Sequence, residues 1–153
     1  MTGNDNIKVL AVASIGGHWE QLMMMRDLFE QYDSEFVTTD AKLFDAYGVR
    51  AGHAIPDCNR DTPFVVIKAI FQIHSIMRKV QPDIVISTGA LPGLLCIVIG
   101  RLNGAKAVWV DSIANAEHLS LCGRFAKYLA NSCVTQWKHL ADSPRISYFG
   151  SVL

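Results

Sequence analysis

The sequence predicts a Rossmann-like α/β fold, with a mostly parallel sheet and helices on both of its faces. Short apolar runs rich in β-branched residues alternate along the chain with longer amphipathic stretches, and this alternation is typical of a sheet built from β-α-β units. Glycine-containing turns follow several of the apolar runs. The length of 153 residues and the hydrophobic share of 50% suffice for one packed core, so we expect a single domain over residues 1–153.

Each element is assigned from hydrophobic periodicity and from the residues that interrupt it. Strands are expected at residues 7–13, 35–39, 83–87, 105–110, 132–135 and 145–149, and helices at 19–29, 63–80, 94–103 and 120–129. Pro63 suits the first turn of its helix, with Asp61 or Thr62 as the cap. Residues 40–61 are polar and contain glycine and proline breakers, so we expect a loop there.

Three loops follow predicted strands at the edge where parallel α/β sheets bind ligands. These loops are residues 14–18, 88–93 and 111–117. In such sheets the binding crevice lies outside the carboxyl ends of the strands. Candidate site residues are therefore expected in these three loops.

The first of these loops, Ser14-Ile15-Gly16-Gly17-His18, has the features of an anion site. Paired glycines let a ligand approach the backbone closely, and a helix N-terminus presents N–H groups to a phosphate or diphosphate. A tight turn alone would explain the same glycines. The dinucleotide pattern G-x-G-x-x-G and the phosphate-loop lysine are both missing, which disfavours NAD and ATP sites.

Two residues are candidates for proton transfer, His18 and Asp111. His18 begins the helix after the glycine pair, where an imidazole could act as an acid or base or serve only as a polar cap. Asp111 ends the strand at 105–110, where a carboxylate could be a general base or could cap the following turn. The residue types alone leave both alternatives open.

The second and third loops offer polar contacts to the same ligand. Thr88, Gly89 and Gly93 can supply a hydroxyl and free backbone N–H groups, although a plain strand-to-helix connection would need the same glycines. Ser112 and Asn115 lie in the third loop and are further candidates for binding the acceptor or its phosphate.

The helix at 63–80 carries more apolar residues than contact with one sheet requires. Phe71 widens its apolar stripe, and Lys68, Arg78 and Lys79 occur with no acidic residue from 62 to 82. An apolar band edged by cations suits a helix on a membrane surface, so these four residues are candidate membrane contacts. A well-buried amphipathic helix is the alternative.

Charge and cysteine content exclude several other classes of function. Residues 1–76 hold 6 basic and 10 acidic side chains, and residues 77–153 hold 8 and 4, for a net charge of zero. That asymmetry is too mild for a nucleic-acid-binding protein. The four cysteines lack metal or redox spacing and are expected to be free thiols in a reducing cytoplasm. We expect no metal site.

Targeting signals are also missing from the sequence. The polar N-terminus lacks the pattern of a signal peptide. The apolar stretch at 84–100 contains serine, threonine, glycine and proline, so it is expected to form a strand, a turn and a helix instead of a membrane span.

Six motifs, taken in order, resemble those of one known family. They are Val12-Ala13-Ser14-Ile15-Gly16-Gly17-His18, Ser87-Thr88-Gly89, Asp111-Ser112-Ile113-Ala114-Asn115, Leu119-Ser120-Leu121-Cys122-Gly123, Thr135-Gln136-Trp137 and Tyr148-Phe149-Gly150-Ser151-Val152-Leu153. The series is similar to that of the oligosaccharide-biosynthesis family, which includes the membrane-anchoring subunit of the eukaryotic dolichyl-diphosphate N-acetylglucosamine transferase. It resembles most strongly the bacterial exopolysaccharide subunits of the PssD type, associated with glucuronosyl transfer. More distantly, it is similar to the N-terminal half of the peptidoglycan lipid-intermediate N-acetylglucosaminyltransferase.

This resemblance implies the N-terminal, acceptor-binding half of a GT-B glycosyltransferase. It implies a polyprenyl-diphosphate-linked saccharide as acceptor and a PssE-type catalytic subunit that binds the UDP-sugar, so that no cofactor is held by this chain. The implied reaction is inverting transfer of glucuronic acid in exopolysaccharide synthesis, with the isolated chain inactive. The implied location is cytoplasmic, peripheral on the inner face of the cell membrane.

The same resemblance assigns roles to residues at the cleft. Gly16, Gly17 and His18 would meet the acceptor, and Asp111 stands where many relatives carry glutamate. The sequence departs from the eukaryotic subunit in lacking an N-terminal membrane span. The alternative function is a non-catalytic adaptor that recruits and activates the UDP-sugar-binding partner at the membrane.

Overall fold

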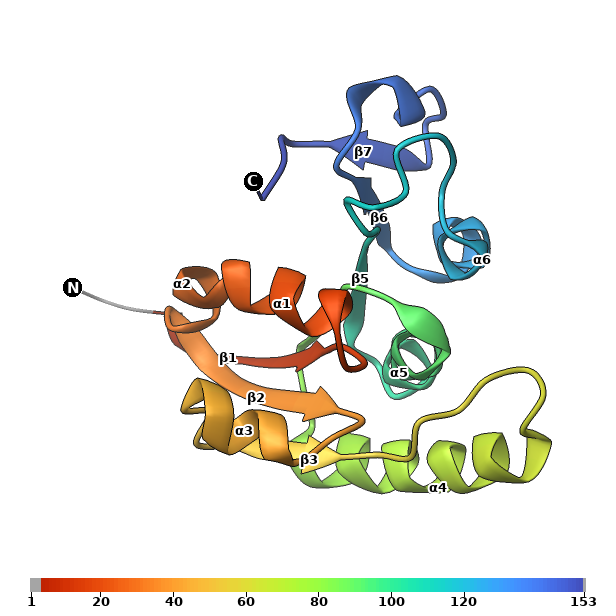
Figure 1. The fold of residues 1–153 in the computed structure, drawn as a ribbon. Coiled ribbons are helices and arrows are strands. Elements are labelled where there is room, and N and C mark those ends of the chain that lie inside the picture. Colours follow the sequence, from red (N-terminus) through yellow and green to blue (C-terminus); the bar gives the residue numbers. More distant parts are fainter. Residues whose placement is uncertain (1–3, 153) are drawn as a thin grey trace.

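The computed structural model describes residues 4–152, which form one seven-stranded parallel sheet with helices on both faces (Figure 1). The strands are β1 (Asn4–Val12), β2 (Tyr32–Thr38), β3 (Gly52–Ala54), β4 (Ile84–Ser87), β5 (Lys106–Val110), β6 (Ser132–Thr135) and β7 (Ile146–Tyr148). The helices are α1 (Gly17–Met24), α2 (Arg26–Phe29), α3 (Lys42–Tyr47), α4 (Pro63–Val80), α5 (Ala90–Leu102) and α6 (Leu121–Leu129), with a 3-10 helix η1 (Lys138–Leu140). The predicted α/β class is confirmed.

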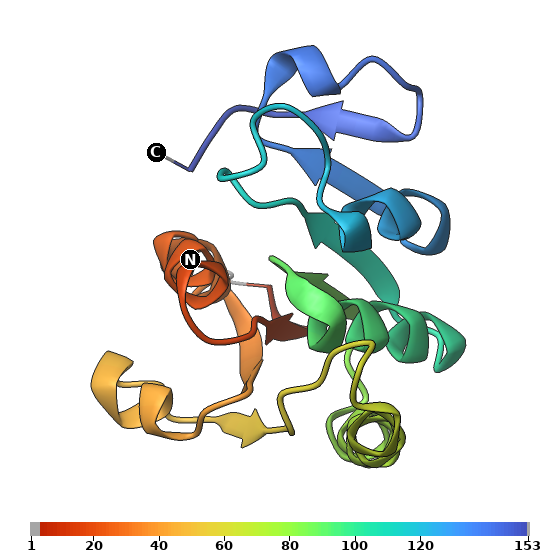
Figure 2. The same ribbon diagram turned by 45° about the vertical axis from the view of Figure 1, so that its right-hand side comes forward.

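The strand order places the functional edge of the sheet. The order is β3-β2-β1-β4-β5-β6-β7, and each neighbouring pair is parallel. Sheet growth reverses direction between β1 and β4. Because crossovers are right-handed, α1, α2 and α3 cover one face and α4, α5 and α6 the other (Figures 1 and 2). Ligands of Rossmann-like sheets bind outside the carboxyl ends of the strands at such a reversal.

β1 lies at the centre of the sheet and is buried on both sides. Its residues Leu10 and Val12 belong to the core under α4, α5 and α6, whereas Val9 and Ala11 belong to the core under α1 and α2. Successive side chains of a strand point to opposite faces, and a parallel sheet covered on both faces reads as a continuous apolar run. This is the reason that the first strand was recognisable from sequence.

The expectation of a loop over residues 40–61 is wrong in part, because α3 and the short edge strand β3 lie there. Phe44 and Tyr47 of α3 pack edge-to-face on buried Trp19, with ring centroids 6.1 and 6.0 Å from it. Gly48, taken as a breaker, caps the end of α3 with a φ of 63°. The glycine therefore delimits the helix instead of preventing it.

Two predicted helices have different bounds in the structure. The helix expected at 19–29 is divided into α1 and α2 at Met25. The helix expected from residue 94 begins at Ala90, so Gly93 lies inside α5 and not in a turn. A Cβ on Gly93 would overlap the hydroxyl of Ser87 on β4, so the glycine lets α5 approach the sheet closely.

α4 has the predicted bounds and begins with Pro63 at its first position. The hydroxyl of Thr62 does not cap the helix. It accepts a hydrogen bond from the Asn59 N–H and donates one to the Asn59 carbonyl, so it closes the turn before α4.

Candidate functional site

Two loops at the reversal point are joined by reciprocal hydrogen bonds. The hydroxyl of Thr88 donates to the His18 carbonyl over 2.7 Å, and Nδ1 of His18 lies 3.1 Å from the Thr88 carbonyl. Because a carbonyl only accepts, Nδ1 donates, and Nε2 of the neutral imidazole carries the lone pair. Within residues 4–152, Nε2 has no hydrogen-bond partner. His18 is thus oriented as a general base would be.

The Gly89 turn permits this arrangement. Gly89 has a φ of 152°, and a Cβ there would overlap the His18 ring. The next residue, Ala90, has a φ of 65°, a backbone conformation that is uncommon for a residue with a Cβ. Such conformations gather at ligand sites. The glycine and the alanine therefore place the start of α5 directly against His18.

A cavity of about 390 Å³ opens beside His18. Its walls come from the starts of α1, α5 and α6 and from residues 111–117, which we call the site loop. The lining residues are Gly17, His18, Ala90, Ser112, Ala114, Asn115, Ser120, Leu121 and Cys122. The first turns of α5 and α6 hold no acidic residue. Helix N-termini present free N–H groups and partial positive charge, so three of them at one cavity suit a diphosphate.

The glycine pair before α1 has two different causes. Gly16 has a φ of 79° and caps α1, so the turn itself requires a glycine. Gly17 has no such requirement, and a Cβ on it would meet nothing within 4 Å. It lines the cavity, where a bare backbone lets a ligand come close.

Asp111 is a structural anchor, which argues against its expected role as general base. It is 1% exposed. Its Oδ1 accepts from Trp109 Nε1 over 3.0 Å and from the Ser120 hydroxyl over 2.6 Å, and its Oδ2 accepts from the Ser120 N–H over 2.9 Å. Both oxygens are engaged inside the fold, and Asp111 is absent from the cavity lining.

The anchored carboxylate organises the start of α6. Ser120 caps this helix by accepting a hydrogen bond from the Gly123 N–H over 2.9 Å. A Cβ on Gly123 would lie 2.5 Å from Asp111 Oδ1, so only glycine fits beneath the carboxylate. The pattern Ser120-Leu121-Cys122-Gly123 thus sets a helix N-terminus on the cavity wall.

The remaining loop candidates divide into residues that line the cavity and residues that support it. Ser112 and Asn115 line it, as predicted from their loop. Ser14 and Thr88 are buried behind it. Gly93 does not line it, and its packing against Ser87 accounts for the glycine without a ligand. Our expectation of a ligand contact at Gly93 is therefore corrected.

Reasoning from sequence missed the contribution of α6. Ser120, Leu121 and Cys122 line the cavity, although the motif at 119–123 was visible as part of the family resemblance. Burial, and then the nearby Asp111, raise the pKa of the Cys122 thiol above its ordinary value. Cys122 is thus a protonated wall residue at neutral pH and is unsuited to act as a nucleophile.

The candidate membrane residues lie on α4, away from the cavity. Lys68, Phe71, Arg78 and Lys79 are all exposed. No helix within the described residues is both long enough and apolar enough to cross a bilayer. No group of three or more histidine, cysteine, aspartate or glutamate side chains in the same part of the chain could hold a metal ion.

Comparison with known sequences gives one consistent family. The profile described as "Oligosaccharide biosynthesis protein Alg14 like" matches residues 23–152. The human "UDP-N-acetylglucosamine transferase subunit ALG14" is 23% identical over 188 aligned positions, covering all of this chain and 86% of the human protein. The Candida glabrata protein of the same name is 33% identical over 85 residues, which cover 46% of this chain and 34% of the yeast protein.

Comparison with solved structures supports the fold. MurG of Acinetobacter baumannii has a TM-score of 0.79 at 14% identity, covering 93% of this chain and 45% of that one. The S. aureus MnaA–UDP complex has a TM-score of 0.73 at 14% identity, covering 95% and 44%. The chain therefore spans less than half of either structure. It has the Rossmann-like fold of one half of a GT-B glycosyltransferase, as predicted.

Proposed function

The chain belongs to the Alg14-like family of oligosaccharide biosynthesis proteins, and we propose that it is the acceptor-binding subunit of a two-component inverting glycosyltransferase. The acceptor is a polyprenyl-diphosphate-linked saccharide, and the catalytic partner binds the UDP-sugar. The observation that carries this proposal is the cavity where α1, α5 and α6 begin beside the fixed His18. Its backbone N–H groups suit the acceptor's diphosphate.

The reaction divides between the two subunits. A hydroxyl of the acceptor sugar attacks the anomeric carbon of the UDP-sugar from the face opposite UDP, so the new C–O bond forms as the bond to UDP breaks. The hydroxyl proton passes to Nε2 of His18, whose Nδ1 remains bonded to the Thr88 carbonyl. The leaving UDP keeps the electron pair and is stabilised by the partner.

A non-catalytic adaptor is the second candidate function. The observation that favours it is the engagement of both Asp111 oxygens, which leaves His18 as the one candidate base among the described cavity-lining residues. In an adaptor, the cavity would hold the acceptor while every proton transfer occurred on the partner.

The donor sugar and the partner type are finer proposals. The motif series resembles the PssD-type subunits, which supports glucuronic acid, exopolysaccharide synthesis and a PssE-type partner. The curated relatives are instead named as subunits of a UDP-N-acetylglucosamine transferase. Both UDP-sugars therefore belong in the same assay.

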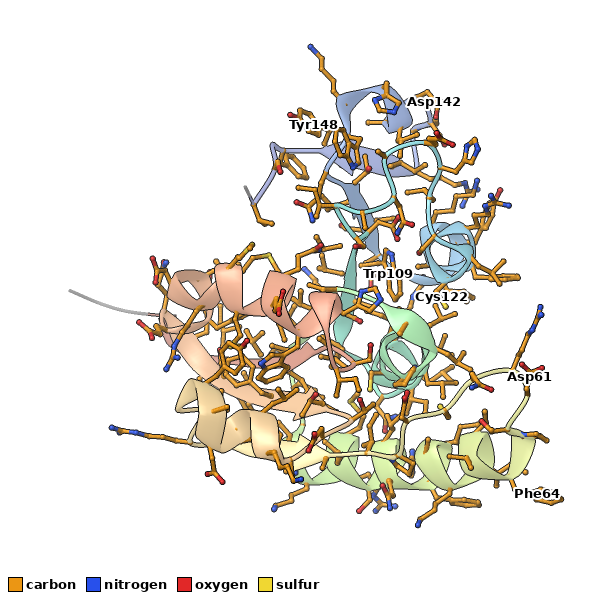
Figure 3. The ribbon with its side chains drawn as sticks, in the orientation of Figure 1. Asp61, Phe64, Trp109, Cys122, Asp142 and Tyr148 are labelled. Atoms are coloured by element: carbon orange, nitrogen blue, oxygen red, sulfur yellow. The ribbon has the colours of Figure 1, made fainter. Side chains whose placement is uncertain are left out.

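We further propose that α4 rests on the inner face of the cell membrane. Phe64 and Phe71 are 86% and 73% exposed, and Ile67 between them is half exposed. This spacing puts the three on one side of the helix, and Phe64 points away from the fold (Figure 3). α4, α5 and α6 contain no acidic residue, so this face suits an anionic lipid surface.

Reconstitution with the catalytic partner tests the function. We expect sugar transfer to a polyprenyl-diphosphate-linked acceptor only when both subunits are present. His18→Ala should lower kcat/KM by about 100-fold or more, the usual effect of losing a general base. The control is His118→Ala, an exposed histidine outside the cavity, which should change little.

Three results of the reconstitution separate the alternatives. No transfer by two folded subunits with either donor overturns the glycosyltransferase proposal. Transfer that survives His18→Ala within a few-fold supports the adaptor. A loss confined to His18→Ala supports the general base.

A further inference from the structure

The site loop is irregular, yet it presents Ser112 and Asn115 to the cavity. Its own hydrogen bonds are few: the Asn115 N–H donates to the Ser112 carbonyl over 3.0 Å, and the Ala114 N–H lies 3.3 Å from the Ser112 hydroxyl. Polar backbone groups inside a fold need partners. Two buried glutamines from other parts of the chain supply them.

Gln21 brackets the peptide on either side of Ser112. Its Nε2 donates to the Asp111 carbonyl over 3.3 Å, and its Oε1 accepts from the Ile113 N–H over 3.0 Å. The partners fix which end of the amide is nitrogen, because one is a carbonyl and the other an N–H. Gln21 is 3% exposed, so losing it would leave both backbone groups unpaired away from water.

Gln136 holds the same loop from the other side. Its Nε2 donates to the Asp111 carbonyl over 3.2 Å, and its Oε1 accepts from the Val152 N–H over 3.0 Å. The Asp111 carbonyl therefore accepts from both glutamines. The indole of Trp137 adds a hydrogen bond of 2.7 Å to the Ile113 carbonyl.

We infer that Gln21 and Gln136 are positioning residues that set the site loop against His18 and so determine the affinity of the cavity for a diphosphate. His18 and Gln21 lie three residues apart on α1, within one helical turn. One short helix therefore fixes both the imidazole and the loop that carries Ser112. The inference rests on the proposed function, because it assumes that this cavity binds the acceptor's diphosphate.

The test uses the full chain with inorganic pyrophosphate as the probe. Gln21→Met and Gln136→Met keep the side-chain length but remove the hydrogen bonds. Gln31→Met is the matched control, since Gln31 also donates to a backbone carbonyl, that of Asp27, but at an exposed position outside the cavity. Calorimetry gives the dissociation constant, and circular dichroism verifies that each variant is folded.

We expect each site variant to bind pyrophosphate about tenfold more weakly, because a tenfold change corresponds to the loss of roughly one hydrogen bond to a buried group. The control should bind as the wild type does. The backbone amide signal of Ile113 in nuclear magnetic resonance spectra should shift in Gln21→Met, and Gln21→Glu should restore part of the affinity at low pH, where a protonated carboxyl can again donate.

Two results would overturn the inference in different ways. If the wild type binds pyrophosphate and both folded site variants bind within twofold of it, the positioning role is wrong and the proposed function stands. If the folded wild type does not bind pyrophosphate, the anion cavity of the proposed function fails, and the positioning role fails with it. Either glutamine alone suffices if the other variant does not fold.

Discussion

Thr88 and His18, 70 residues apart in the chain, hold one another through two hydrogen bonds at the reversal point of the sheet. This pair joins the first turn of α1 to the turn that precedes α5. Two of the three helix N-termini at the cavity therefore keep a fixed spacing. Changes next to this pair are expected to disturb the cavity more than changes of the same type elsewhere.

Gly89→Ala should destabilise the fold by about 3 kcal/mol, since it adds both backbone strain and overlap with the His18 ring. Gly104→Ala is the control, because Gly104 has a φ of 92° but open space around its Cβ position. It should lose only about 1 kcal/mol. Urea unfolding measures both values, and equal losses would show that His18 does not pack on Gly89.

Gly17→Ala should separate stability from function. Alanine in place of glycine in a helix contributes up to about 1 kcal/mol, and here its Cβ meets nothing in the chain. The free energy of unfolding should stay level or rise. The added methyl group narrows the cavity wall, so pyrophosphate binding by calorimetry should weaken about tenfold. Unchanged binding would mean that the ligand does not approach Gly17.

Asp111→Asn should act on stability much more than on catalysis. The asparagine amide turns an N–H donor toward one of the donors that Asp111 now accepts from, on Trp109 or Ser120. An unpaired buried group of this kind costs about 1–3 kcal/mol. In the reconstituted enzyme, folded Asp111→Asn should keep kcat within about tenfold. A 100-fold fall at unchanged stability would restore Asp111 as the general base.

Phe71→Ser should weaken binding of the chain to vesicles that contain anionic lipid. Removing an inserted aromatic side chain loses part of about 2 kcal/mol of apolar burial, so we expect about a tenfold lower partition coefficient in sedimentation assays. Met24→Ser on α1, at the opposite face and also exposed, should bind like the wild type. Equal losses for the two variants would place the membrane contact elsewhere.

Periodicity and turn residues were enough to predict most of the fold. The apolar run of β1, the proline that opens α4 and the glycine after β4 each report a local requirement of the backbone. α3 escaped prediction because it is only six residues long and buries no side chain completely. Its stability comes from contact with Trp19, a tertiary effect that local sequence does not carry.

The site was predicted by position better than by role. His18 and Asp111 both follow strands, and their neighbours in sequence offered no way to tell them apart. The difference arises in space: Ser120, nine residues further on, and the indole of Trp109 enclose the carboxylate, while the imidazole stays at the cavity. The glutamine contacts to the site loop span 90 and 25 residues, beyond the reach of any short motif.

The central claim is that the cavity beside His18 binds the diphosphate of the acceptor. The direct measurement is a titration of the ¹⁵N-labelled chain with a short-chain isoprenyl diphosphate that carries one N-acetylglucosamine, followed through the backbone amide signals. We predict saturable shifts at Gly16, Gly17, Ala90 and Cys122, at the starts of α1, α5 and α6. Shifts confined instead to the basic hollow formed by Arg101, Lys127 and Arg145 at the other end of the sheet, or no shifts at all, would contradict it.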